Sequence, residues 1–278
     1  MVELFHRVSQ ECSQAVTKRY STSFSSAIRL LHPDLRQPVY NIYGFVRLAD
    51  EIVDSFQGFD QPALLEQFKI NTCEAIRSGI SLNPVLNSFQ KTVNEYKIDL
   101  CLVDAFFNSM EMDLTKQVYD QPGYMDYIYG SAEVVGLMCL SVFCERDKEK
   151  FARLEPSARA LGAAFQKVNF LRDLKADFNG LSRSYFPGFD FNNFSFRQKA
   201  SIEDEIQGDF QQALKGITQL PLKARFGVYV AYKYYLSLFR KIKKMQPSRI
   251  LESRIRIPAY HKVMIVIRAG VKNQLRLI

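Results

Sequence analysis

Apolar residues recur every three to four positions along most of this chain, which is the period of an amphipathic α-helix. The chain has no internal repeat and no low-complexity linker, and its 13 Gly and 10 Pro are too few for a sheet with many turns. The sequence therefore predicts an all-α fold, a single helical bundle over residues 1–278. The predicted helices cover 37–56, 61–78, 84–97, 100–116, 123–144, 148–177, 201–216, 221–244 and 260–277.

Composition narrows the class of protein further. With 278 residues, 47% of them hydrophobic, the chain can bury a large core, which excludes disorder and small disulfide scaffolds. The longest apolar runs, 134–143 and 263–267, are shorter than the roughly 18 residues of a membrane-spanning helix, and the polar N-terminus is unlike a signal peptide. Five cysteines without CxxC spacing and three isolated histidines argue against disulfides, structural zinc and a histidine base. We therefore expect a cytoplasmic protein.

The net charge of +8 is unevenly distributed along the chain. Residues 215–278 contain 15 Lys or Arg and one acid, a net +14, so residues 1–214 carry −6. Such a segment suits an anionic membrane surface, a phosphorylated substrate or nucleic acid. We expect peripheral attachment to an anionic membrane, with helix 221–244 as the contact, and no nucleic acid. The alternative is that these cations only solvate helix faces.

One candidate chemical site lies in the predicted helix 37–56. At about 100° per residue, Tyr43, Arg47, Asp50 and Asp54 fall on one stripe roughly 60° wide, opposite the apolar side of the helix. Asp50 and Asp54 are one turn apart, and like charges at this spacing repel unless a cation lies between them. Considered alone, the stripe also fits a solvated helix face on which Arg47 is the partner.

The same spacing of two aspartates recurs in the predicted helix 148–177. Gly162, Gln166, Asn169, Asp173 and Asp177 form a stripe about 80° wide with apolar residues on both borders. Buried acids need a partner of opposite charge. Two such helices facing each other would enclose four carboxylates, and oxygen ligands without His or Cys suit Mg²⁺. The two stripes together predict a diphosphate bound through magnesium.

Several separate motifs carry a resemblance to a known family. They are YSTSFSSAIRLL, IYGFVRLADEIVD, YIYGSAEVVG, QKVNFLRDLKADF and RSYFP, and they extend from about Tyr20 to about Lys262. In these segments the chain resembles the bacterial phytoene and squalene synthases, which are head-to-head prenyl transferases. The resemblance implies the isoprenoid synthase type of helical bundle, with a central cavity.

The resemblance also implies roles for individual residues. It assigns Mg²⁺, or Mn²⁺ in its place, to Asp50, Asp54, Asp173 and Asp177, and it adds Arg172 and Tyr129 to the catalytic group. Phe24, Tyr43, Tyr129 and Tyr185 are expected near the reacting carbons. The residues expected around the substrate and its diphosphates are Ser21, Ser23, Phe24, Tyr43, Arg47, Gln166, Asn169, Arg172 and Tyr185. Two positions depart from the family pattern, Tyr20 where some relatives have His and Glu133 where many have Gly.

The reaction implied is the condensation of two prenyl diphosphates, favoured as geranylgeranyl diphosphate, through a cyclopropyl diphosphate to phytoene. Squalene or dehydrosqualene synthesis from farnesyl diphosphate is the main alternative. NADPH is not expected. A head-to-tail chain elongator or terpene cyclase fits less well, because such elongators carry DDxxD whereas Glu51 follows Asp50 here. A non-catalytic assembly factor of the same superfamily also stays open, as do the substrate length and the oligomeric state.

Overall fold

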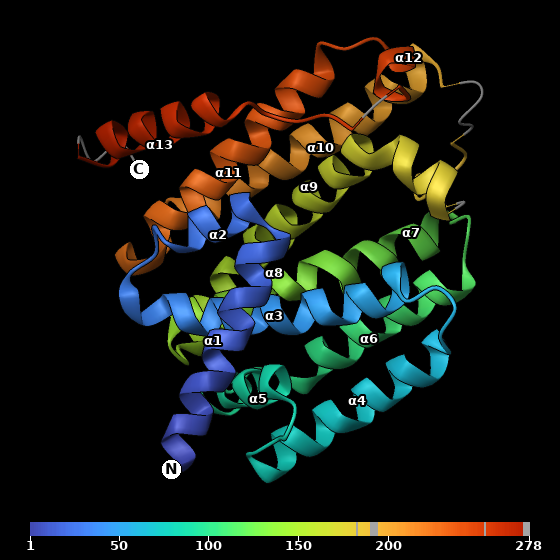
Figure 1. The fold of residues 1–278 in the computed structure, drawn as a ribbon. Helices are drawn as coiled ribbons and strands as arrows, with labels where there is room; N and C mark the ends of the chain where they lie inside the picture. The colour runs from blue at the N-terminus through green and yellow to red at the C-terminus, as the bar shows by residue number, and fades with distance from the viewer. Residues whose placement is uncertain (182, 190–193, 253, 275–278) are drawn as a thin grey trace.

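The computed structural model describes residues 1–181, 183–189, 194–252 and 254–274, without the side chains of 176–181, 259 and 274. The described residues are mostly helical (Figure 1), and Val118 and Ser184 form one isolated parallel bridge. The elements are α1 (Val2–Tyr20), α2 (Thr22–Ile28), α3 (Pro33–Ser55), α4 (Gln61–Ser78), α5 (Pro84–Tyr96), α6 (Leu100–Thr115), α7 (Gln121–Ile128), η1 (Tyr129–Glu133), α8 (Val134–Cys144), α9 (Lys148–Leu181), α10 (Phe196–Ile217), α11 (Leu222–Lys243), α12 (Pro247–Ile250) and α13 (Ala259–Gln274).

The predicted all-α class is confirmed, and each predicted helix corresponds to helix in the structure. Periodicity did not predict α1, α2 or α12. In α1 the buried positions are Ser9, Ser13 and Thr17, small polar residues four apart that no search for apolar periodicity selects. Ser13 Oγ lies 2.6 Å from Ser88 Oγ of α5, so this helix packs through hydrogen bonds between small side chains.

The predicted helix 123–144 is one helical stretch with a change of pitch. A π-helical turn, η1, separates α7 from α8, and such wide turns are frequent at functional sites. A Cβ added to Gly162 of α9 would lie 2.5 Å from the carbonyl oxygen of Ala132 in η1. The two backbones therefore approach so closely that only glycine fits. Gln121–Cys144 also has the length and composition of a membrane span, but 72% of its most apolar window is buried inside the structure, as in a core helix.

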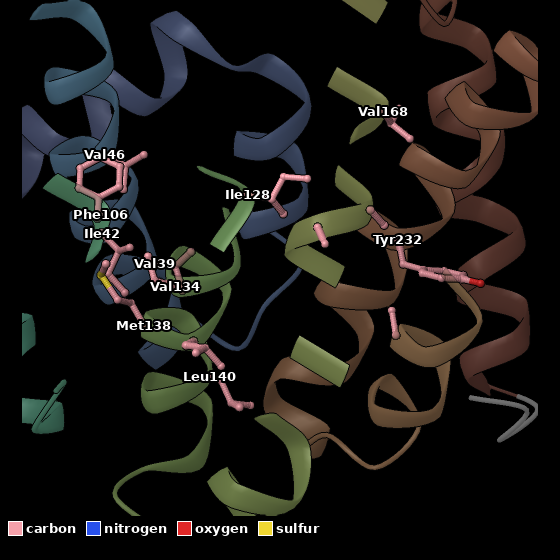
Figure 2. Packing of buried hydrophobic residues seen from close by; sticks show 14 of the residues in the cluster. Val39, Ile42, Val46, Phe106, Ile128, Val134, Met138, Leu140, Val168 and Tyr232 are labelled. Carbon is pink, nitrogen blue, oxygen red and sulfur yellow. The ribbon is translucent and has the colours of Figure 1, made fainter. Parts of the chain in front are cut away.

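The core is centred on aromatic residues of α3, α5 and α6. The ring centroid of Phe45 lies 3.9 Å from that of Phe89, 5.3 Å from that of Phe106 and 5.6 Å from that of Phe107. Figure 2 shows the neighbouring aliphatic packing of α3 against α8. In Figure 1, α3 to α6 lie on one side of the molecule and α9, α10, α11 and α13 on the other. Helix α8 contacts both α3 and α9.

Helix α11 does not have the exposed apolar face that was expected of a membrane contact at 221–244. Its apolar side, including Tyr229, Val230, Leu236, Phe239 and Ile242, is buried. The expectation was wrong because periodicity shows that a helix has an apolar face but not what covers it. In α11 the apolar face packs in the core of the protein.

Replacing Gly162 with Ala should lower the free energy of unfolding by about 1–3 kcal/mol, because backbone atoms of η1 cannot rotate away from the new methyl group. Urea unfolding followed by circular dichroism measures the change. Gly208 of α10, which has no atom within 4 Å of an added Cβ, provides the control. There, alanine should be neutral or stabilise by about 0.5–1 kcal/mol. Equal effects at both positions would contradict a tight contact between α9 and η1.

Candidate active site

A cavity of about 310 Å³ is lined by residues of α2, α3, α8, α9, α10 and α11 among others. Most of its wall is apolar. Its polar lining includes Ser21, Tyr43, Asp50, Gln166 and Asn169. All five were candidate site residues on sequence grounds, so the two predicted stripes do meet in one space.

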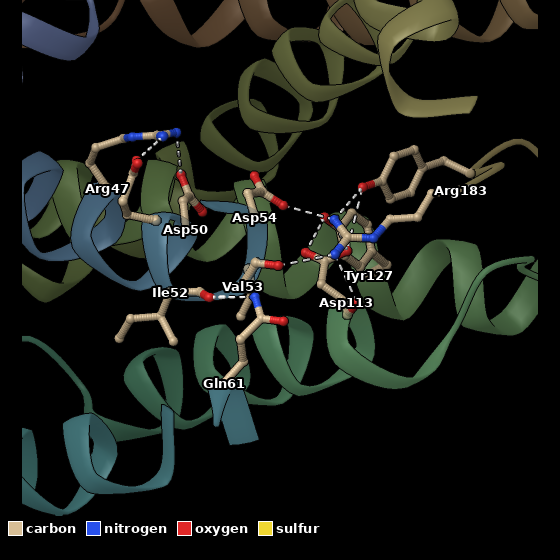
Figure 3. A network of polar contacts seen from close by, with 11 residues as sticks. Arg47, Asp50, Ile52, Val53, Asp54, Gln61, Asp113, Tyr127 and Arg183 are labelled. Carbon is tan, nitrogen blue, oxygen red and sulfur yellow. Dashed lines mark hydrogen bonds and ion pairs between the residues drawn. The ribbon is translucent and has the colours of Figure 1, made fainter. Parts of the chain in front are cut away.

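The α3 stripe is held by a network of ion pairs. Arg47 pairs with Glu51, lies 3.8 Å from Asp50 through Nη1 and Oδ2, and has its guanidinium carbon 4.5 Å from the ring centroid of Tyr20. Figure 3 shows Asp50 and Asp54 on the same side of α3. The departure from the family pattern at Tyr20 therefore places an aromatic ring on the arginine of the stripe.

The carboxyl group of Asp50 is desolvated and lies near other acids. Its desolvated position raises the pKa of the carboxyl group to about 7, and the acids Asp54 and Asp113 act in the same direction while Arg47 opposes them. A carboxylate in this state gains from any further cation that enters the cavity.

Asp54 and Asp113 share Arg183, a residue of the RSYFP motif (Figure 3). Arg183 Nη1 lies 2.8 Å from Asp54 Oδ1 and 3.4 Å from Asp113 Oδ1, and Nη2 donates to the carbonyl oxygen of Asp113 at 2.8 Å. Tyr127 donates its hydroxyl hydrogen to Asp113 Oδ2 at 2.8 Å. Burial raises the pKa of Asp113 to about 7 against the effect of Arg183.

Neither Arg183 nor Asp113 was proposed from the sequence. Arg183 stood in a quoted motif, and Asp113 follows Phe106 and Met110 on the buried face of α6. An acid on an otherwise apolar face was the available signal for Asp113. The pairing itself joins residues 70 positions apart and could not be predicted from local pattern.

The α9 stripe has its own cations. Arg172 Nε donates to Asp173 Oδ2 at 3.0 Å, and Arg254 Nε lies 2.8 Å from Asp173 Oδ1. The side chain of Asp177 lies outside the described residues. Asn169 lines the cavity, and its buried Oδ1 has no hydrogen-bond partner among the described residues, so this oxygen can accept from a ligand.

The C-terminal segment also reaches the site. Lys262 donates from Nζ to Ser23 Oγ at 3.0 Å, and Ser23 donates to the hydroxyl oxygen of Tyr234 at 3.0 Å. Together with Arg254 on Asp173, Lys262 places two more cations beside residues assigned to the diphosphates. The high positive charge of 215–278 is evident from the sequence, but the sequence did not predict that two of its cations lie at this site.

Of the four aromatic residues expected near the reacting carbons, only two line the cavity. Phe24 stacks on Tyr43 with ring centroids 4.7 Å apart, and both line the cavity. Tyr185 stacks on Phe170 at 4.1 Å, next to Asp113. Tyr129 is not among the residues that line the cavity.

Tyr129 instead lies at a second ion pair, between η1 and α9. The guanidinium carbon of Arg159 is 5.1 Å from the ring centroid of Tyr129, and Arg159 Nε is 2.6 Å from Glu133 Oε2. Glu133 is buried and neutralised by this pair. From the same helical stretch it is Tyr127 that lines the cavity.

The donors around the cavity fit a hard cation that is shared with a ligand. Within the described residues, no group of three or more His, Cys, Asp or Glu side chains could hold a metal ion by itself. Asp50 and the free Oδ1 of Asn169 nevertheless offer oxygen donors to the same space. Mg²⁺ commonly binds few protein carboxylates and completes its shell with water and phosphate oxygens. The residues present therefore fit Mg²⁺ bound together with a diphosphate.

The fold and site geometry agree with the comparison to known sequences. The sequence profile of the family described as squalene/phytoene synthase matches residues 17–261. The chain belongs to the squalene/phytoene synthase family. The match spans both aspartate stripes, the η1 segment and the RSYFP motif.

Individual relatives are distant. Phytoene synthase 1 from Solanum lycopersicum is 27% identical over 259 residues, which are 86% of this chain and 60% of the relative. The 4,4'-diapophytoene synthase of Staphylococcus haemolyticus is 25% identical over 202 residues, 72% of this chain and 68% of that protein. A crystal structure of a dehydrosqualene synthase with ligand superposes with a TM-score of 0.80 at 20% identity, covering 97% of this chain and 98% of that one. This structural likeness supports the fold.

Replacing Arg183 with Met should lower the free energy of unfolding by about 3–5 kcal/mol, because it leaves the buried Asp113 carboxylate without its cation. Arg254→Met is the matched control, since it also removes an arginine from an aspartate but at a half-exposed position, and should cost less than about 1 kcal/mol. Thermal and urea unfolding measure both. If the two variants were equally stable, the Arg183 network would not be the structural support inferred here.

Proposed function

We propose that this protein condenses two prenyl diphosphates head to head, through a cyclopropyl diphosphate, with release of diphosphate. The observation that carries the proposal is that one apolar cavity joins the Asp50 face of α3 to the Gln166 and Asn169 face of α9. Family membership supports the same reaction. Apolar chains fit the wall of this cavity, and phosphate oxygens fit its polar lining at Asp50, Gln166 and Asn169.

The residues of the chain have distinct tasks in this proposal. Asp50, Asp54, Asp173 and Asp177 would hold Mg²⁺, which when bound supplies the positive charge that stabilises a departing diphosphate. Arg172 and the nearby cations Arg254 and Lys262 would bind diphosphate oxygens directly. They lie beside Asp173 and Ser23.

The apolar wall would govern the carbocation chemistry. Ionisation of one prenyl diphosphate breaks its C–O bond, the allylic cation then alkylates the double bond of the second molecule, and loss of a proton closes the cyclopropane. Stacked rings on the cavity wall, Phe24 on Tyr43 and Phe165 on Tyr235 with centroids 3.8 Å apart, present π-faces that stabilise cations. The same wall excludes water, which would otherwise quench the cation.

The chain length of the substrate depends on how deep the cavity is. Along α9 its lining extends from Asn169 to Leu154, which at 1.5 Å per residue is about 22 Å. We favour two geranylgeranyl diphosphates and phytoene as product, in line with the tomato relative. Squalene or dehydrosqualene from farnesyl diphosphate is the alternative, in line with the staphylococcal relative, and a non-catalytic assembly role is the third.

Product analysis decides among these three. Purified protein with Mg²⁺ should convert geranylgeranyl diphosphate to phytoene, identified by mass spectrometry, with no requirement for NADPH. Asp50→Asn should abolish product without loss of thermal stability, because it removes a negative charge from a site where acids repel one another. Dehydrosqualene or squalene from farnesyl diphosphate alone would establish the alternative. No product from either substrate in a folded protein would favour the assembly factor.

Mg²⁺ and an unreactive prenyl diphosphate analogue should stabilise the fold cooperatively, because neither alone balances the charges of the cavity. Ligands that bind the native state raise the melting temperature by linkage. The shift with both present should exceed the sum of the two separate shifts in differential scanning fluorimetry. Asp50→Asn should remove most of this excess. Full stabilisation by the analogue in EDTA would contradict binding through Mg²⁺.

A further inference from the structure

Helix α13 carries an apolar face that none of the described residues covers. At about 100° per residue the face is a stripe roughly 100° wide, and its residues are exposed although apolar. They are Tyr260 (69% exposed), Val263 (58%), Met264 (42%), Ile267 (60%) and Val271 (51%). Five such side chains in a continuous row are not the scattered surface hydrophobics of an ordinary protein, and a contiguous patch of this kind marks an interaction site.

The opposite side of α13 fixes the helix to the body of the protein. Ile265 and Ala269 are buried, and α13 packs on α11 (Figure 1). Lys262 near the start of α13 donates to Ser23 and lies with its Nζ 5.2 Å from the ring centroid of Tyr234. The exposed row is therefore held in a fixed orientation, and its first turn adjoins the residues assigned to the substrate.

Cations border the exposed row. Arg268 and Lys272 are exposed next to it, and residues 254–274 contain no acid. Neither cation takes part in a salt bridge among the described residues. Burial, Lys272 and Arg240 together lower the pKa of Lys233 on the adjoining α11, as expected where positive charges gather without acidic partners.

We propose that the exposed face of α13, Tyr260 to Val271, docks the protein on an anionic lipid bilayer. A helix with an apolar row bordered by Lys and Arg lies in the plane of a membrane interface, with its apolar side among the acyl chains and its cations at the headgroups. A second copy of the chain fits this face less well. In a two-fold contact the same patch meets itself, so that Arg268 and Lys272 would face the same cations.

Docking through α13 goes beyond the proposed reaction and does not depend on it. It would place the start of α13, where Lys262 contacts Ser23, the chain neighbour of the cavity-lining Phe24, next to the bilayer. A long apolar ligand could then pass between membrane and cavity with little exposure to water.

Vesicle flotation of the full chain tests the docking. Wild-type protein should float with phosphatidylcholine vesicles that contain phosphatidylglycerol, and salt should weaken this binding because it screens charges over about 10 Å at 0.1 M. Ile267→Ser/Val271→Ser should reduce the bound fraction at either salt concentration. Arg268→Glu/Lys272→Glu should reduce the affinity for anionic vesicles at least about tenfold and leave little salt dependence.

Matched controls test whether the loss of vesicle binding is specific to the α13 face or follows from any change of exposed apolar residues or surface charge. Ile80→Ser/Leu82→Ser removes two exposed apolar residues between α4 and α5, and Arg7→Glu/Lys91→Glu reverses two exposed cations on α1 and α5. Both should float as the wild type does. All variants should keep their melting temperature and their turnover of detergent-solubilised substrate.

Three results would overturn the docking of α13 on lipid. The α13 variants could float as well as the controls, or the wild type could float equally with neutral and anionic vesicles. Light scattering could also show a dimer that Ile267→Ser/Val271→Ser dissociates without any change in flotation. In that last case the face would be a contact between copies of this chain.

Discussion

Charge balance at the polar end of an apolar cavity is the constraint on which the site depends. Acids from three helices lie in this region, and Asp54, Asp113 and Asp173 are paired with arginines. Asp54 and Asp113 share Arg183, whereas Asp173 is held by Arg172 and Arg254. These pairs keep the acids in place without a ligand, while leaving Asp50 and the free oxygen of Asn169 able to accept more positive charge.

The packing around the cavity allows this arrangement. The close backbone contact of Gly162 with η1 brings α9 against the stretch that leads into α8. Tyr127 of α7 lines the cavity, whereas Tyr129, two positions further along the helix, does not. Buried small side chains such as Ser13 of α1 similarly let three helices approach. The active-site helices are thus positioned by residues that have no part in chemistry themselves.

The sequence predicted the helices and the polar stripes that follow from local periodicity. It did not predict contacts between residues that are far apart in the chain. Helix α9 and the stripe with Gln166 and Asn169 follow from a 3.6-residue period, and both residues do line the cavity. The Arg183–Asp113 pair was missed because it depends on how α6 meets the segment after α9. Helix α1 was missed because its buried face is polar. The apolar face of α11 was correctly recognised but assigned to a membrane, since a pattern does not identify the covering surface.

The contact of Lys262 with Ser23 has a consequence for the synthesis of the protein. These residues are 239 positions apart, so the substrate end of the cavity joins the second helix of the chain to the last helix described here. Contacts of such separation form late, because the cost of closing the loop comes before the contact is made. A nascent chain on the ribosome can form α3 and its neighbours early, yet it cannot complete the site until residue 262 has left the exit tunnel. The contact between the second helix and α13 therefore forms only after residue 262 has emerged.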